Sequence, residues 1–259
     1  MNLTAAVLAF LLALPVWAQQ FPNKPIRVVS PYGPGGTVDA LLRPLQEPLA
    51  KLLGQQILID NRPGAGGAMG TREVARAAPD GYTLIAGNNG PNAILPALQK
   101  DLGYDALKSF EPVVILATVP MVVTVHPGVP AASLREFLAL ARGDARGVEY
   151  ASVGIGSMGH FATDMLARAA NVKLVHVPYN GGGPATASIL AGDTKLYISS
   201  FNVGMKAQAE AGKHRILAVT SPSLTSSSAT APSAPTRPTF RRHGSARCWP
   251  PRCGAGRRW

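Results

Sequence analysis

Residues 30–39 read SPYGPGGTVD, and residues 151–161 read ASVGIGSMGHF. Each stretch follows a short β-branched or aliphatic run and precedes a helical pattern, so each is predicted to be a glycine loop between a strand and a helix. Glycine lets the backbone approach a ligand closely, and the first amides of a helix carry a partial positive charge. Both loops are therefore predicted to be cradles for an anion. For residues 30–39, a tight turn without a ligand is an equally good interpretation.

Outward from these loops, short apolar runs alternate with amphipathic stretches, which is typical of α/β units with a largely parallel sheet. The predicted strands are 26–30, 56–60, 83–86, 113–117, 121–125, 148–152, 174–177, 196–199 and 216–220. A capping box, Ser-Leu-Arg-Glu at 133–136, predicts the start of a helix. Residues 38–53 also have a helical pattern, but Pro44 and Pro48 predict that this helix is kinked or broken. A further apolar stripe predicted to face the core comprises Ala162, Met165, Leu166 and Ala169.

The first 18 residues have the form of a secretion signal. An uninterrupted apolar run at residues 5–14 is too short to span a bilayer, and the small residues Val16 and Ala18 suit cleavage by signal peptidase. Export is therefore predicted, with a buried core helix as the alternative for this segment. The rest of the α/β pattern divides into a first lobe at residues 21–120 and a second lobe at residues 121–220.

Composition changes abruptly at residue 221. Residues 221–259 hold seven arginines, no acidic residue and both cysteines, so the formal net charge falls from +11 for the whole chain to +4 without them. This segment has no aliphatic periodicity and is not predicted to form a packed element. It is either a basic tail for membranes or nucleic acid or, as its composition favours, the product of a shifted reading frame. A disulfide, a cysteine nucleophile and a thiolate metal site are excluded from the remainder.

Residues 154–159 spell GxGxxG, a pattern found in dinucleotide-binding folds. The next predicted strand runs into Pro-Tyr-Asn at 178–180, where such folds need an acidic residue to hold the ribose hydroxyls. The loop is therefore predicted to be a second anion cradle, with Ser152 and Ser157 as hydroxyl donors. A nucleotide-dependent enzyme is the alternative from a different class.

Two further glycine-rich segments are residues 60–70, DNRPGAGGAMG, and residues 79–90, PDGYTLIAGNNG. Their glycines predict tight turns, and Asn88 ends a predicted strand where a polar side chain can enter a cleft. Ligand contact and plain turn chemistry are equally good interpretations of both segments.

No catalytic residue, metal site or cofactor is predicted. The five histidines, at 126, 160, 176, 214 and 243, lack metal-ligand spacing and are interpreted as loop or surface residues. His160 differs from the others because it lies at the start of the helix after the second cradle. No Walker A loop and no GxSxG elbow occur in the sequence.

Together these segments resemble the Bug family, the periplasmic receptors of tripartite tricarboxylate transporters. The matching segments are 34–39, 61–67, 80–84, 126–127, 154–160, 177–179 and 212–221. The resemblance implies an α/β, two-lobed periplasmic-binding-protein fold of the Venus-flytrap type, in which loops of both lobes bind a small carboxylate. Because the family continues beyond residue 221 and returns to the first lobe, the fold is expected to be incomplete at the C-terminus, and a truncated, non-functional product is a further alternative.

The resemblance also implies a periplasmic solute-binding protein that is not an enzyme. Its ligand would be a di- or tricarboxylate, an acidic amino acid or an aromatic acid, delivered to membrane permease subunits or presented to a sensor. We further expect a monomer with no nucleic-acid partner. The expected ligand contacts are Tyr32, Gly35, Gly36, Thr37, Asp39 and Asn88 from the first lobe and Ser152, Gly154, Gly156, Ser157 and His160 from the second.

Overall fold

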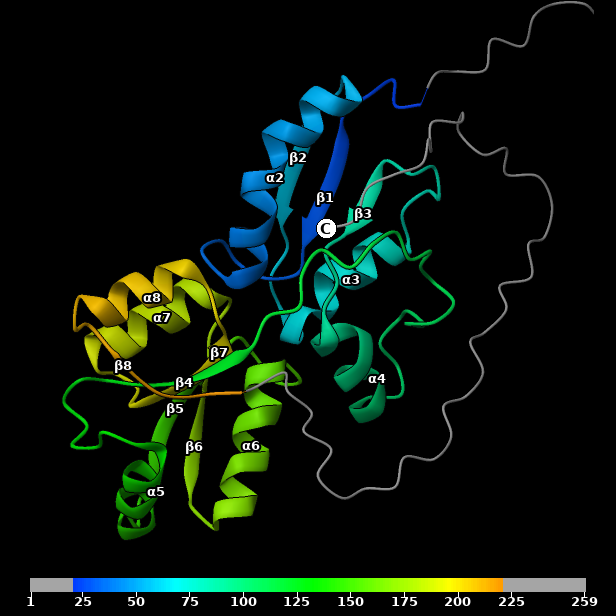
Figure 1. Ribbon diagram of the computed structural model, residues 1–259. Coiled ribbons are helices and arrows are strands. Elements are labelled where there is room, and N and C mark those ends of the chain that lie inside the picture. The colour runs from blue at the N-terminus through cyan, green and yellow to red at the C-terminus, as the bar shows by residue number, and fades with distance from the viewer. Residues whose placement is uncertain (1–20, 221–259) are drawn as a thin grey trace, which may run out of the picture. The chain divides into compact units, whose positions relative to one another are not determined.

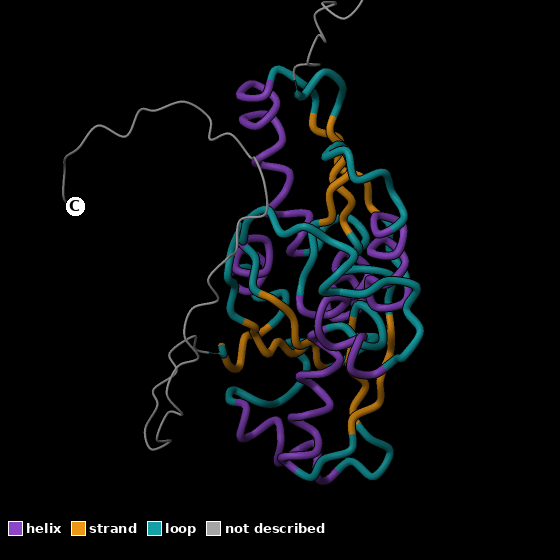
Figure 2. The backbone as a smooth tube through the Cα atoms, turned by 90° about the vertical axis from the view of Figure 1, so that its right-hand side faces the viewer, coloured by secondary structure: helices purple, strands orange, loops and turns teal. Residues whose placement is uncertain are grey.

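The computed structural model describes residues 21–220 (Figure 1). The predicted secretion signal and the arginine-rich tail therefore lie outside the described residues. Within the described range, strands and helices alternate along the chain, and the loops that join them can be followed in teal in Figure 2. No helix in this range is long and apolar enough to cross a membrane.

The N-terminal half of the described chain builds a three-stranded parallel sheet with the order β2-β1-β3. Its strands are β1 (Ile26–Ser30), β2 (Ile57–Asn61) and β3 (Thr83–Ile85). Its helices and helical turns are α2 (Thr37–Leu53), η1 (Ala65–Gly67), α3 (Ala68–Ala75), η2 (Gly90–Ile94) and α4 (Leu95–Leu98). Arg27 on β1 binds both Asp60 on β2, at 2.5 Å, and Glu73 on α3, so one guanidinium ties two strands to a helix.

The following residues build a five-stranded sheet with the order β6-β5-β7-β4-β8. Its strands are β4 (Met121–Val125), β5 (Val148–Ser152), β6 (Leu174–Pro178), β7 (Leu196–Ser200) and β8 (Arg215–Val219). The helices are α5 (Leu134–Gly143), α6 (Met158–Ala170), α7 (Gly182–Ala191) and α8 (Val203–Glu210). Because β4 runs antiparallel to β7 and β8 while β5 runs parallel to β6 and β7, this sheet is mixed, not largely parallel as the pattern predicts.

Two apolar clusters hold the helices to opposite faces of this sheet. Phe137 of α5 and Leu166 of α6 pack in one cluster, whereas Ile189 of α7 and Met205 of α8 pack in the other. In Figure 1, α7 and α8 lie together above β4 and β8, whereas α5 and α6 lie lower, with α6 beside β6. The sheet is covered on both faces, so its strand ends and the loops beyond them are the places left for a site.

The strand predicted at residues 113–117 is wrong. This segment forms no strand, and the side chains of Val113 and Ile115 are 78% and 84% exposed. β-branched residues favour a strand only where a neighbouring strand supplies hydrogen bonds. Within residues 21–220, nothing pairs with this segment.

Two predictions about helices also need correction. A break in the first helix is wrong, because α2 runs without interruption through Pro44 and Pro48. The stripe on α6 is only partly buried, since Met165 is 56% exposed while Leu166 packs against the core. The capping box is confirmed at Ser133, whose hydroxyl accepts the Glu136 amide at 3.2 Å.

Candidate functional site

The first loop, residues 33–36, joins β1 to α2 and packs against a second run of glycines, residues 181–183, at the start of α7. Gly33 and Gly181 form a parallel β-bridge. A Cβ atom added at Gly182 would lie 2.6 Å from the Cα atom of Gly36, so only glycine at 182 allows this approach. Residues 181–183 were not among the predicted site residues, although three consecutive glycines are a visible signal in the sequence.

The helix α2 begins without a side-chain cap. Gly36 is its N-cap residue, and no side-chain hydrogen bond caps the first turn. The Thr37 hydroxyl instead donates to the Ser200 carbonyl at the end of β7, at 2.9 Å. Thr37 therefore connects the first loop to the five-stranded sheet.

The carboxylate of Asp39 turns into the protein and accepts hydrogen bonds from three sides. Its donors are the Gly35 amide at 3.2 Å, the Arg43 guanidinium at 2.6 Å and the Asn61 side chain at 3.3 Å. Burial alone would raise the pKa of Asp39, but the bonds from Arg43, Gly35 and Asn61 hold it below its usual value. The Gly35 amide of the first loop thus already binds an anion of the protein itself, the Asp39 carboxylate at the start of α2.

Tyr32 and Asn88 lie side by side beneath the second loop, residues 154–157. The buried Tyr32 hydroxyl is 3.1 Å from both the Asn88 side-chain oxygen and the Gly66 carbonyl. Burial raises the pKa of Tyr32 to about 12, so this phenol is a neutral hydrogen-bond donor at physiological pH. A Cβ atom at Gly90 would lie 2.8 Å from the Tyr32 hydroxyl and 3.4 Å from the Gly156 carbonyl. The Tyr32 hydroxyl and the second loop therefore both lie next to Gly90.

The second loop joins β5 to α6 and fits closely against η1 and α4. A Cβ atom at Gly66 of η1 would lie 2.0 Å from the Ile155 carbonyl, and one at Gly156 would lie 2.1 Å from the side chain of Leu95. Ser157 is the N-cap of α6, and its hydroxyl accepts the His160 amide at 3.3 Å. This cap uses one lone pair of the Ser157 hydroxyl and leaves its proton available, so its role as a hydroxyl donor to the ligand stays a prediction.

Two imidazole rings lie beside this loop. His160 accepts the Gly156 amide through Nδ1 at 3.4 Å, and its ring centroid is 4.4 Å from that of His176 on β6. His176 in turn places Nε2 2.5 Å from the Ser152 hydroxyl and stacks on Tyr150, with ring centroids 5.0 Å apart. Desolvation lowers the pKa of both histidines, so the pair is neutral at pH 7.

His176, predicted from the sequence to be a loop or surface histidine, lies next to the second loop. It lies on β6 and is the register partner of Tyr150 on β5. Because side chains two apart in a strand share one face, Tyr150, Ser152 and His176 must project together. This parity argument could have found His176 once β5 and β6 were taken as neighbours.

The predicted ligand residues therefore form two groups. Gly35, Gly36, Thr37 and Asp39 lie with residues 181–183, whereas Tyr32, Asn88, Ser152, Gly154, Gly156, Ser157 and His160 lie around the second loop. In the part of the chain that the structure describes, no three histidine, cysteine or acidic side chains come together in a group that could hold a metal ion.

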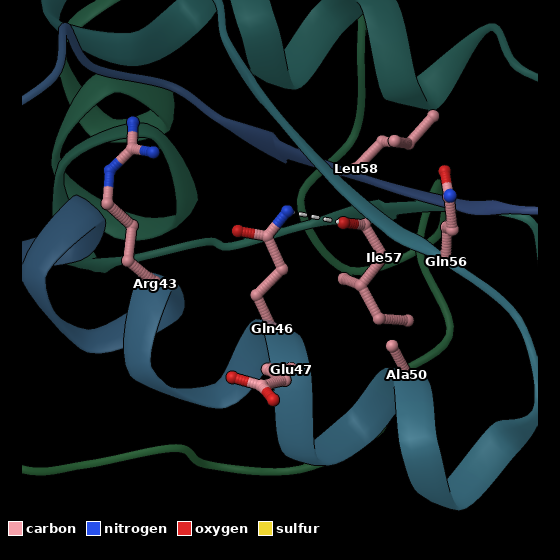
Figure 3. Close-up of a pocket in the computed structure, with 7 residues that line it drawn as sticks. All are labelled: Arg43, Gln46, Glu47, Ala50, Gln56, Ile57 and Leu58. Carbon is pink, nitrogen blue, oxygen red and sulfur yellow. Dashed lines mark hydrogen bonds between the residues drawn. The ribbon is translucent and has the colours of Figure 1, made fainter.

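A surface pocket of about 370 Å³ lies between α2 and the outer edge of β2 (Figure 3). The Gln46 side chain points across it and donates to the Ile57 carbonyl at 2.7 Å. Arg43 also lines the pocket, but its guanidinium already pairs with Asp39. None of the eleven predicted ligand residues lines this pocket, so it does not extend either group.

Comparisons with known proteins agree on one family. A family profile described as tripartite tricarboxylate transporter family receptor matches residues 41–246. A UPF0065 protein of Bordetella bronchiseptica is 35% identical over 221 residues, which are 85% of this chain and 65% of that protein.

Solved structures lead to the same family. MatC from Rhodopseudomonas palustris with bound malate is 32% identical, with a TM-score of 0.72 over 78% of this chain and 68% of that chain. Another R. palustris protein, solved with adipate, is 33% identical, with a TM-score of 0.74 over 78% of this chain and 67% of that chain. The chain covers 67% and 68% of these two solved chains, less than two thirds of the B. bronchiseptica protein, and 53% to 56% of several other relatives.

Proposed function

Because the chain belongs to the tripartite tricarboxylate transporter receptor family of periplasmic binding proteins, we propose that it captures a small organic acid in the periplasm. The captured acid is then delivered to membrane permease subunits or presented to a sensor. Relatives solved with malate and with adipate support a dicarboxylate as the ligand class.

The observation that carries this proposal is a contrast between two hydrogen bonds of the same form. In each loop a glycine amide donates to the side chain four residues later: Gly35 to the carboxylate of Asp39, and Gly156 to the imidazole of His160. The first acceptor is charged, whereas the second is neutral and its bond is long, at 3.4 Å. An incoming carboxylate can replace a neutral acceptor, but it is repelled by a charged one.

The second loop also supplies the positive field that an acid needs. It precedes α6, whose first amides and helix dipole favour an anion at this end. The Ser152 hydroxyl and the Gly154 amide lie at the same strand end. We place one acid group of the ligand here and the other near the Tyr32 hydroxyl and Asn88, which lie below the loop as neutral polar groups.

This function needs no chemical step. Amides and hydroxyls stabilise the bound acid by hydrogen bonds, and the ligand leaves unchanged. The nucleotide-dependent enzyme is the competing function, because the same loop has the GxGxxG pattern.

Thermal unfolding with a ligand panel tests the proposal. A ligand that binds only the folded protein stabilises it by about 2.7 kcal/mol at one hundred times its Kd, which is a measurable rise in Tm. We expect malate, adipate or a related dicarboxylate to raise the Tm, while NAD and ATP leave it unchanged. A rise with a nucleotide and with no acid would contradict the proposal.

Two serine variants locate the site. Ser157→Ala and Ser133→Ala each remove a helix N-cap that accepts an amide, so each should lower the free energy of unfolding by about 1 kcal/mol. Only Ser157→Ala lies in the second loop. Calorimetric titration should show weaker acid binding for this variant and unchanged binding for Ser133→Ala, whereas equal affinities would place the acid elsewhere.

A further inference from the structure

The buried Ser152 hydroxyl at the end of β5 has more partners than it has protons. Its oxygen is 2.5 Å from His176 Nε2, accepts the Gly154 amide at 3.0 Å and is 3.3 Å from the Gly154 carbonyl. A serine hydroxyl carries one proton and two lone pairs. The protonation of His176 Nε2 therefore decides which way the Ser152 proton points.

Two arrangements are possible. If Nε2 carries no proton, Ser152 must donate to it, and the serine then offers only an acceptor to the second loop. If Nε2 carries a proton, the imidazole donates to Ser152, and the hydroxyl proton is free to point toward an acid oxygen. The imidazolium and the neutral Nε2–H tautomer both give this arrangement, but only the imidazolium takes up a proton, so counting protons on binding separates the two. The second arrangement suits an anion and the first does not.

The groups that face His176 leave it uncharged in the absence of a ligand. Tyr150 of β5 stacks on the ring with centroids 5.0 Å apart, and the ring of His160 of α6 lies 4.4 Å from it. Asp164 of α6 is the nearby carboxylate, but it is paired with Arg168 at 2.8 Å. Among residues 21–220, no acidic side chain hydrogen-bonds either imidazole, so an acid ligand would be the first anion to contact this pair.

We propose that His176 is a positioning residue for the second loop: an acid group bound there draws a proton onto His176 Nε2, which turns the Ser152 hydroxyl toward the ligand and couples binding to proton uptake. This inference rests on the proposed acid-binding function and deepens it. His176 acts on the ligand through Ser152. His160, whose ring contacts that of His176, experiences the negative charge of the bound acid as well.

The direction of the pH effect follows from linkage. Desolvation, together with the neighbouring His160, lowers the pKa of His176 to about 4. A bound carboxylate raises the pKa of His176, because negative charge favours the imidazolium form. A proton held more tightly in the complex makes the acid bind more tightly as the pH falls. The gain should grow below neutral pH and stop near pH 4, where the ligand-free protein is protonated as well.

Titration calorimetry with malate, from about pH 8 to about pH 5, tests this coupling. The variant His176→Gln keeps an amide that can donate to Ser152 but cannot titrate, and His126→Gln is a matched control, because His126 accepts the Gly128 amide in a separate turn. We expect malate to raise the pKa of His176 by about two units, and the affinity of the wild-type protein should then rise about tenfold more between these limits than that of His176→Gln, because part of the linked gain lies below pH 5. Protonation of malate itself affects all three proteins equally and cancels in this comparison.

Repeating the titration in buffers of different ionisation enthalpy counts the protons. We expect uptake by the wild-type protein and by His126→Gln, and none attributable to the protein in His176→Gln. Equal uptake in all three proteins would overturn the inference while leaving acid binding intact, whereas no malate or adipate binding at any pH would remove the proposed function itself. If His176→Gln fails to fold, the imidazole proton resonances of the wild-type protein report the same titration, and a His176 pKa unchanged by saturating malate overturns the inference.

Discussion

The two glycine loops share one design and differ in charge. Each follows a strand, precedes a helix and directs a glycine amide to the side chain four residues later. In the first loop that side chain is Asp39, an anion held by Arg43; in the second it is His160, a neutral ring. The difference teaches that loop geometry alone does not make an anion site, because the charge of the group already in the loop decides whether another anion can enter.

Replacing the neutral acceptor of the second loop by a charged one should have the largest effect on malate affinity. His160→Asp gives the second loop the acceptor that the first loop has, four residues after the glycine. A carboxylate beside a bound acid is a like-charge contact, so we expect malate affinity to fall by about 100-fold or more, or roughly 2.7 kcal/mol. The isosteric neutral variant His160→Asn is the control and should lose far less. Equal losses for the two variants would mean that charge is not the deciding property.

Displacing the second loop without changing its charge should have the next largest effect. Gly66→Ala introduces a Cβ atom 2.0 Å from the Ile155 carbonyl and should weaken malate binding about tenfold or more. Gly54→Ala is the matched control: its φ of 68° is close to the 64° of Gly66, but nothing lies within 4 Å of the added atom. Both variants should lose about 1 kcal/mol of stability from backbone strain. If both variants lost malate affinity to the same extent, the packing of the second loop against η1 would not be what binding depends on.

Neutralising the first loop should change stability more than binding. Asp39→Asn removes a charged acceptor of the Gly35 amide and the partner of Arg43, so the free energy of unfolding at pH 7 should fall by about 1–3 kcal/mol. Because the pKa of Asp39 is lowered in the folded protein, its contribution is present above the ordinary aspartate pKa and is lost as the pH falls through the folded-state value. Denaturation curves of the wild-type protein and the variant should therefore converge below about pH 4. A large change in malate affinity at pH 7, in either direction, would instead place the acid at the first loop.

Local features were well predicted from the sequence. The helix start at Ser133 and the strand that leads into each glycine loop depend on neighbouring residues, and the structure confirms them. Features that depend on distant partners were not predicted. Residues 113–117 have the composition of a strand but no strand beside them, and the close packing of residues 181–183 on the first loop joins positions far apart in the chain.

The direction in which each side chain of the site points was the feature hardest to predict from the sequence. The sequence places Asp39 and His160 at equivalent positions, but it does not show that both turn back to their own loops. Nor does it show that Ser152 is held by His176, because that contact needs the register between β5 and β6.

Backbone amide shifts during a malate titration of the isotope-labelled protein test the central claim most directly. If the second loop receives the acid, the resonances of Gly154 and Gly156 will shift progressively to saturation, while that of Gly35 stays in place because Asp39 already holds its amide. A saturable shift of Gly35 and Gly36 with Gly154 and Gly156 unchanged would contradict the account.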